Sequence, residues 1–209
     1  SIINTFCGVG SKRGPHDQYF YRYPDKIISG EISTPRFLLN NKSLVTAHIH
    51  SLVLEIIGTK VPQKIEEIIE LEDDALPLKT DLVNDLQRAI QKNKQEILEA
   101  INESFEGERN TFGWFDNDFI GNTVDNFVKD MDDSFEFYRK EFSQLKRELY
   151  QLNVQGERKG LTSDKEGRRK AIEGKLKDMR EGGKDYFSYR YLASQGFTPN
   201  YGFPTHVST

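Results

Sequence analysis

The sequence is poor in cysteine and in long apolar runs, and each shortage excludes a class of protein. Cys7 is the single cysteine in 209 residues, so the chain forms no internal disulfide, which suits a reducing compartment. No run of about 18 or more apolar residues is present, so we expect no membrane-spanning helix. The first residues also lack the basic start and apolar core of a signal peptide. These absences predict a soluble, cytoplasmic protein with no membrane partner.

The motifs of common catalytic sites are missing as well. No phosphate-binding G-x-x-x-x-G-K-S/T loop is present, and the glycine-rich residues 8–12 have the wrong spacing for one. His48 and His50 are two residues apart, so a helix would direct them differently, and we expect one packed and one exposed rather than a metal pair. Cys7 and His16 have no spacing typical of a nucleophile and its base. We therefore expect no catalytic residue, metal or cofactor in this chain.

The net charge of −4 conceals an uneven distribution along the chain. Residues 1–60 carry 7 basic and 4 acidic side chains, and residues 61–138 carry 7 basic and 20 acidic ones. Residues 139–209 are basic again, with 15 basic and 9 acidic side chains. A nucleic acid would be attracted to the two end regions and repelled by the middle. Oppositely charged helices lying side by side would give the same pattern, so both interpretations stay open.

The first part of the chain predicts little helix. Residues 1–7 are apolar and β-branched, which favours a short strand, and residues 8–36 are punctuated by glycine and proline. The chain also starts without methionine. We therefore expect a fragment of a longer protein, whose first strand belongs to a sheet elsewhere in that protein.

Three helices are predicted in the next part of the chain. The first covers residues 44–57, with capping side chains just before it and Gly58 at its end. The second begins at Pro62, carries isoleucines on one face, and ends in the acidic residues 70–74. The third covers residues 80–105, where apolar residues recur at helical spacing.

Residues 118–155 show the clearest helical periodicity. Ten apolar residues, here called the apolar stripe, recur at steps of three and four: Ile120, Val124, Phe127, Met131, Phe135, Tyr138, Phe142, Leu145, Leu149 and Leu152. They predict one helix about 50 Å long, which must bury the stripe against another helix. The expected partner is the helix over residues 80–105, in an antiparallel hairpin or bundle. An intermolecular coiled coil with a partner subunit or a second copy is the alternative.

The last part of the chain is expected to be more open. Residues 155–170 look exposed and mobile, and glycines weaken a basic helix predicted over residues 163–181. A short aromatic helix over residues 184–195 is capped by Gly196, and residues 197–209 are expected to be extended.

These elements predict a mainly α fold with a long helical hairpin or bundle, a short N-terminal strand and loop, and an extended C-terminal tail. We expect three parts. Residues 1–42 form the strand and an aromatic and basic loop, residues 43–155 form the helical domain, and residues 156–209 form a basic segment that ends in the tail.

One loop has the composition of a nucleic-acid site. Residues 12–22 interleave basic and aromatic side chains, so that cations can hold phosphates while rings stack on bases. Ordinary aromatic packing would explain the same rings. The candidate nucleic-acid-binding residues are Lys12, Arg13, His16, Gln18, Tyr19, Phe20, Arg22 and Arg36.

A second basic stretch lies near the C-terminus, and either a DNA contact or a solvated helix face would account for it. Its members are Arg158, Lys159, Lys165, Arg168, Arg169, Lys170, Lys175 and Lys177.

Three segments together carry a recognisable pattern over about 60 residues. The first comprises Phe6-Cys7-Gly8, Gly14-Pro15-His16-Asp17-Gln18-Tyr19-Phe20-Tyr21-Arg22 and Pro24. The second comprises Ser29-Gly30, Pro35-Arg36, Leu38, Asn40, Leu44-Val45 and His48-Ile49-His50. The third comprises Tyr191-Leu192-Ala193-Ser194-Gln195-Gly196-Phe197, Pro199, Tyr201 and Phe203-Pro204. This pattern resembles the region after the last helicase motif in bacterial superfamily 2 helicases of the antiphage DISARM DrmA type and, more distantly, in YprA/MrfA-type repair helicases.

The resemblance implies a place in a larger machine. This chain would follow the second RecA-like domain, so that the Walker motifs, the arginine fingers and the bound ATP and Mg would lie upstream. In this family the region is an accessory module that contacts DNA or the helicase core. The expected function is therefore a non-catalytic accessory region of an ATP-dependent DNA helicase-like protein in phage defence. The alternative is a protein-interaction module that assembles through the apolar stripe.

Overall fold

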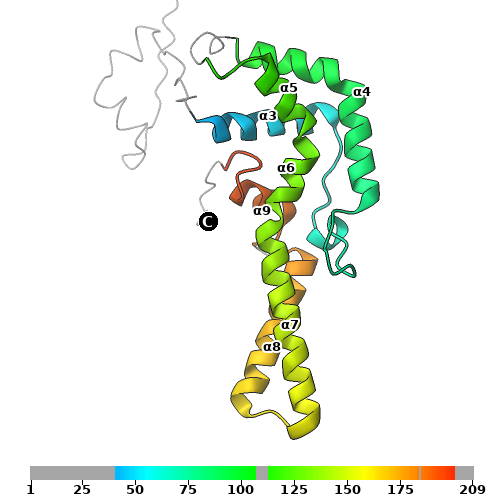
Figure 1. The fold of residues 1–209 in the computed structure, drawn as a ribbon, viewed down its shortest axis with the longest axis vertical. Helices are drawn as coiled ribbons and strands as arrows, with labels where there is room; N and C mark the ends of the chain where they lie inside the picture. The colour runs from blue at the N-terminus through cyan, green and yellow to red at the C-terminus, as the bar shows by residue number, and fades with distance from the viewer. Residues whose placement is uncertain (1–40, 107–112, 184, 201–209) are drawn as a thin grey trace, which may run out of the picture. The chain divides into compact units, whose positions relative to one another are not determined.

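The computed structural model describes residues 41–106, 113–183 and 185–200, and this part of the chain is mainly α-helical (Figure 1). The elements are α3 (Lys42–Ile57), a 3₁₀ turn η1 (Ile65–Glu67), α4 (Thr80–Ser104), α5 (Asn117–Asp125), α6 (Phe127–Ser134), α7 (Glu136–Lys159), α8 (Ser163–Glu181) and α9 (Ser188–Ser194). The mainly α prediction is confirmed. None of the helices described here is long and apolar enough to cross a membrane. The strand and loop predicted over residues 1–36 lie outside the described residues, as does most of the predicted tail.

Three predicted helices are confirmed close to their expected bounds, and local capping signals mark both ends of the first and the C-terminal end of the last. Helix α3 starts where the Asn41 side chain accepts a hydrogen bond from the Leu44 N–H at 3.2 Å, and it ends at Gly58, whose φ is +60°. Helix α4 matches the prediction over residues 80–105. Helix α8 covers the predicted residues 163–181 and ends at Gly182, whose φ is +78°.

The helix predicted from Pro62 is wrong, because only the three residues of η1 are helical there. Ile65, Ile68 and Ile69 are fully buried, as their spacing predicted. Their backbone makes one short turn, in which the Ile68 and Ile69 N–H groups donate to the Ile65 carbonyl, and it then pairs with a returning segment. The Lys79 N–H donates to the Ile68 carbonyl at 2.8 Å, and Ile69 forms an antiparallel bridge with Leu78. This loop buries the isoleucines without a helix.

The single long helix predicted over residues 118–155 is also wrong, because α5, α6 and α7 are separated at Asn126 and Phe135. The side chains of Tyr191, from α9, and of Arg139, from α7 itself, bond backbone groups at the second break. The Tyr138 N–H donates to the Tyr191 hydroxyl at 3.0 Å instead of to the carbonyl one turn earlier. The Asp132 carbonyl accepts from the Arg139 guanidinium at 2.8 Å. Tertiary hydrogen bonds therefore interrupt a helix that the local sequence favours.

The apolar stripe nevertheless keeps its register across both breaks, and its first eight members, Ile120 to Leu145, are each at most 8% exposed. The predicted partner is correct for only part of the stripe. Helix α4 packs against α5 and α6, whereas α7 lies beside α8 (Figure 1). Residues 155–170 are mostly exposed, as predicted, but most of them are helical, since α7 ends at Lys159 and α8 begins at Ser163. Packing within the chain thus buries the first eight members of the stripe and leaves Leu149 and Leu152 half-buried, while assembly with a partner subunit or a second copy stays a prediction.

The predicted aromatic helix is present as the shorter α9. Gly196 follows it with a φ of +78°, a conformation that favours glycine, and the Phe197 N–H turns back to the Leu192 carbonyl at 3.0 Å. The turn places Phe197, which is 3% exposed, inside the core.

Arg139 links the break before α7 to the loop that precedes α4. Its Nε donates to the Leu76 carbonyl at 2.8 Å, and its terminal nitrogens reach the Asp132 carbonyl and carboxylate. Leu76 is buried and has a φ of +51°, a strained conformation for a residue with a side chain. Arg139 therefore holds a strained turn against the helix break.

Replacing Arg139 with methionine should lower the free energy of unfolding by about 1–3 kcal/mol, because the carbonyl groups of buried Leu76 and half-buried Asp132 lose a charged donor. Urea unfolding monitored by circular dichroism measures the change. Arg147→Met, at an exposed position two turns further along α7, is the matched control and should change stability by less than about 0.5 kcal/mol. Equal effects of the two substitutions would show that the Leu76 turn does not depend on Arg139.

Candidate nucleic-acid interface

The nucleic-acid-binding residues predicted from the sequence, from Lys12 to Arg36, all lie outside the described residues. The second basic stretch is described, and it occupies the end of α7 and the length of α8. Most of its cations are engaged within the protein. Arg168 holds Glu148 with two hydrogen bonds of 2.7 and 2.8 Å, Lys175 pairs with Glu141, and Lys165 donates to Gln155. The solvated-face interpretation therefore accounts for much of α8.

These pairs fasten α8 to α7. Arg168 on α8 lowers the pKa of the Glu148 carboxyl on α7 through its hydrogen bonds, so this pair stays charged over a wide pH range. Glu141 on α7 accepts both from Lys175 on α8 and, at 3.0 Å, from the Tyr186 hydroxyl. Although single exposed ion pairs contribute little, together they fix how α7 is presented to solvent.

The outer face of α7 forms a shallow groove, here called the α7 groove. It consists of two open hollows of about 690 and 330 Å³ that share Tyr150 and Gln151. The first hollow reaches toward Asp73 and Asp74 in the loop before α4. The second runs toward the end of α7. The α7 residues that line the groove are Ser143, Lys146, Arg147, Tyr150, Gln151, Val154, Gln155, Arg158 and Lys159.

Four exposed cations stand along this groove: Lys146, Arg147, Arg158 and Lys159. Within the described part of the chain, none of the four forms an ion pair, unlike most cations of α8. Arg147 Nε makes only a long hydrogen bond of 3.3 Å to the Ser143 carbonyl. Unpaired cations in a row provide the sequence-independent part of nucleic-acid binding. Asp73 and Asp74 would repel an anion, and they line only the hollow that contains Lys146 and Arg147.

Tyr150 lies between the two pairs of cations and is 71% exposed, an unusual environment for a large aromatic side chain. Among the described residues its ring contacts no other ring. Sequence reasoning missed Tyr150 because it follows Leu149 of the apolar stripe and looks like one more residue of an amphipathic helix. The sequence does contain a signal, because Tyr150 is an aromatic residue at a position that points away from the apolar stripe and therefore toward solvent.

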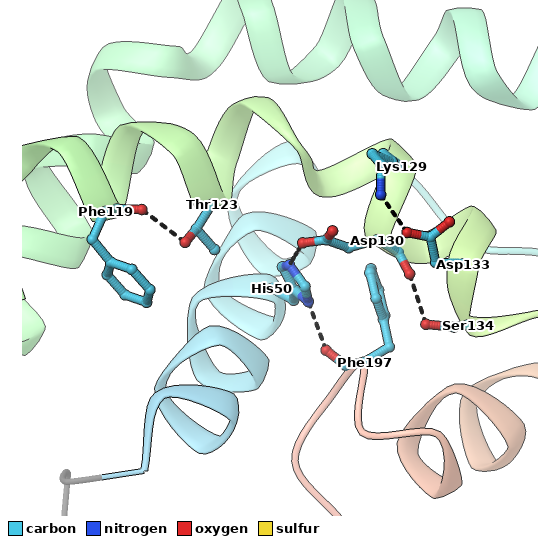
Figure 2. Close-up of polar contacts among 8 residues, drawn as sticks. All are labelled: His50, Phe119, Thr123, Lys129, Asp130, Asp133, Ser134 and Phe197. Atoms are coloured by element: carbon cyan, nitrogen blue, oxygen red, sulfur yellow. Dashed lines mark hydrogen bonds and ion pairs between the residues drawn. The ribbon is translucent and has the colours of Figure 1, made fainter.

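A second polar cluster surrounds His50 in the core, at the meeting point of α3, α6 and the turn after α9 (Figure 2). His50 is 2% exposed, and its Nδ1 lies 2.8 Å from the Phe197 carbonyl oxygen. Because a carbonyl only accepts, Nδ1 carries the proton. The His50 ring stacks on the Phe197 ring at 4.3 Å and meets the edge of Phe127 at 5.3 Å.

The other nitrogen of His50, Nε2, lies 3.4 Å from a carboxylate oxygen of Asp130, without the geometry of a hydrogen bond. Burial lowers the pKa of His50, while the Phe197 carbonyl and the Asp130 carboxylate act in the opposite direction. We assign the net direction to burial, because the imidazole is almost completely enclosed. His50 is therefore a neutral core residue at neutral pH. Of the pair predicted to have one packed and one exposed member, His50 is packed and His48 is half-buried rather than exposed.

The two described segments of the family-like pattern meet at this cluster. His50 and Phe197 are 147 residues apart in the sequence and are joined by the buried hydrogen bond. Tyr191, from the same C-terminal segment, accepts the free N–H at the start of α7, and burial raises the pKa of its hydroxyl to about 12. These residues therefore hold α3, α7 and α9 together, which gives the pattern a structural role in this chain.

Comparison with known protein sequences gives one short match of significant similarity. A stretch of 45 residues is 36% identical to the Druantia protein DruE of Escherichia coli (strain UMEA 4076-1). The match covers 22% of this chain and only 2% of that protein, so the chain corresponds to a small part of its relative. No protein-family model matches the chain, and no solved structure does.

Proposed function

We propose that this chain is a non-catalytic accessory region of an ATP-dependent DNA helicase-like protein in phage defence, and that it contacts DNA through the α7 groove. The observation that carries the DNA contact is the row of four exposed, unpaired cations around Tyr150. The resemblance of the end segments to DISARM DrmA-type helicases supports the helicase setting. The match to DruE, a phage-defence protein, supports the defence setting.

The fold suits a contact surface on a larger assembly. Helix α7 is held along one side by α8 and leaves its groove on the side that faces solvent. Its cations are carried on a helix rather than on a loop, so their spacing is fixed before DNA arrives, which reduces the entropy cost of binding. ATP hydrolysis would belong to the upstream motor domains, and this region would brace or guide the DNA.

Charge reversal in the groove tests the DNA contact. Arg158→Glu should weaken DNA binding by about fivefold at about 0.1 M salt, because a lost phosphate contact removes roughly 0.7 of a released cation. The double variant Arg147→Glu with Arg158→Glu should weaken binding by about 25-fold or more for the same reason. Fluorescence anisotropy with labelled single-stranded and duplex DNA measures both changes.

Lys92→Glu is the matched control, because Lys92 is an exposed lysine on α4, away from the groove, and its reversal changes the net charge equally. It should leave DNA binding within about twofold. Thermal melting of each variant checks that the fold is retained. If Lys92→Glu weakens binding as much as Arg158→Glu, the binding follows net charge alone and the α7 groove is not the contact surface.

A further inference from the structure

We infer that the α7 groove takes single-stranded nucleic acid, with a base stacked on the exposed ring of Tyr150 and phosphates on the cations at either side. This inference rests on the proposed DNA contact and specifies its substrate. It begins from Tyr150, which is 71% exposed at the point that the two hollows of the groove share.

The order of side chains along α7 matches what a single strand requires. Lys146 and Arg147 lie one turn before Tyr150, and Arg158 and Lys159 lie about two turns after it. Lys159 lies 13 residues after Lys146, about 20 Å along the helix at 1.5 Å per residue, which is the reach of a few nucleotides. Proteins that bind single strands combine cations that follow the backbone with rings on which bases stack. The α7 groove has both groups on one helix.

An exposed ring distinguishes single strands from duplexes. In a duplex each base is already stacked on its neighbours, so only base edges are offered to a protein, and a tyrosine ring gains little there. In a single strand the faces of the bases are accessible, and stacking on an aromatic ring is largely independent of sequence. Tyr150 therefore favours an unpaired strand, whereas the four cations alone would accept either form.

Two amide side chains complete the groove. Gln151 lies beside Tyr150, and Gln155 lies one turn further on, where its side-chain oxygen accepts from Lys165 at 2.9 Å. The NH₂ group of Gln155 is left to donate to a base or a phosphate. Beyond Lys146 and Arg147, Asp73 and Asp74 repel phosphates, so the strand is expected to end at these two cations and to run past Tyr150 toward Lys159.

Binding of labelled oligothymidine of about 20 nucleotides, compared with a duplex of the same length, tests the inference. Tyr150→Ala should weaken oligothymidine binding by roughly 5- to 150-fold, the effect of removing one stacking ring. Duplex affinity should stay within about twofold. The slope of log K against log salt for oligothymidine should be about −2.8 for four phosphate contacts, and Tyr150→Ala should leave it unchanged.

Two matched variants isolate the ring. Tyr150→Phe keeps the stacking surface and should retain oligothymidine binding. Phe137→Ala removes another exposed ring of α7, 61% exposed and outside the groove, and should have no effect. If Tyr150→Ala does not fold, cross-linking to a strand that contains iodouracil replaces it, with Tyr150 as the expected adduct in the wild-type protein.

The outcomes separate this inference from the proposed DNA contact. If Arg158→Glu weakens both DNA forms while Tyr150→Ala changes neither, the DNA contact stands and the single-strand inference is overturned. If polyglutamate displaces oligothymidine from wild-type protein as readily as from Tyr150→Ala, the groove is a general polyanion site, and the inference is again overturned. If neither DNA form binds at any salt concentration, both proposals fail.

Discussion

Replacing Phe135 with alanine should lower the free energy of unfolding by about 3–5 kcal/mol, the usual cost of truncating a buried phenylalanine. Phe135 is fully buried at the break between α6 and α7. Its ring stacks on Tyr191 at 5.4 Å and meets Tyr138 edge-on at 6.4 Å. The substitution would open a cavity where α7 and α9 meet, beside the hydrogen bond between the Tyr138 N–H and the Tyr191 hydroxyl. Urea unfolding measures the loss.

Phe137→Ala is the matched control for this prediction, because it makes the same chemical change two residues later at a side chain that is 61% exposed. It should alter stability by no more than about 0.5 kcal/mol. Similar losses at both positions would mean that the register of the apolar stripe differs from the one described here.

The burial of the stripe could be predicted from the sequence, whereas the breaks in its helix could not. Period-3.6 spacing identifies which side chains share a face, and that signal depends only on neighbouring residues. The break at Phe135 depends on Tyr191 and Arg139, whose hydrogen bonds replace those of a continuous helix. Tyr191 is 53 residues away from Tyr138, so no local pattern contains this information.

The same limit explains the residues around Pro62. The spacing of Ile65, Ile68 and Ile69 correctly predicts that they are buried, but it also predicts a helix that is not formed. Pairing of this segment with residues near Leu78 satisfies the backbone and buries the same side chains. Apolar spacing over so short a stretch does not distinguish the two solutions.

The candidate site was only partly predictable. The basic character of the C-terminal part is visible in the composition, but composition cannot tell a cation that is paired, such as Arg168, from one that is unpaired, such as Arg158. That distinction depends on which acidic residues of α7 face α8. Tyr150 was missed because it directly follows Leu149 of the apolar stripe, although the stripe directs position 150 to solvent. Among the described residues, the candidate nucleic-acid surface therefore lies on the outer face of α7 rather than on α8.

The described parts of the resemblance segments bear on the stability of the fold. His50 and Phe197 belong to two of these segments, and they meet in the core rather than at the α7 groove. Substituting either residue would remove the contact between α3 and the turn after α9. Effects of such changes on DNA binding would therefore be indirect, and they should disappear when binding is measured below the melting temperature of the variant.

His50→Ala should lower the free energy of unfolding at neutral pH by about 2–5 kcal/mol, the range for truncating a buried side chain of similar size. The substitution removes the stacking on Phe197 and the edge contact with Phe127, and it leaves the Phe197 carbonyl without its donor. Thermal melting followed by circular dichroism detects the loss, and the cooperativity of the transition shows whether α9 unfolds separately.

The same variant should also change how stability depends on pH. Burial holds the pKa of His50 in the folded chain below its ordinary value near 6.5, so the unfolded chain binds more protons once the pH falls toward that value. His50 therefore adds stability above about pH 6.5 that is lost below it, because protonation is penalised in the fold. Asp130 is the charged group that faces the ring and limits this loss. The stability difference between wild type and His50→Ala should shrink as the pH falls from about 7.5 to about 5.5.

Comparing the two proteins isolates His50 from other titrating groups. Burial also lowers the pKa of His48, but His48 is present in both proteins and its contribution cancels in the difference. Asp130→Asn provides an independent check, because it removes the carboxylate that favours protonated His50 and should therefore steepen the loss of stability at low pH. A difference between wild type and His50→Ala that stays constant over this pH range would show that His50 has an ordinary pKa in the fold. The Phe197 contact would then act through packing alone.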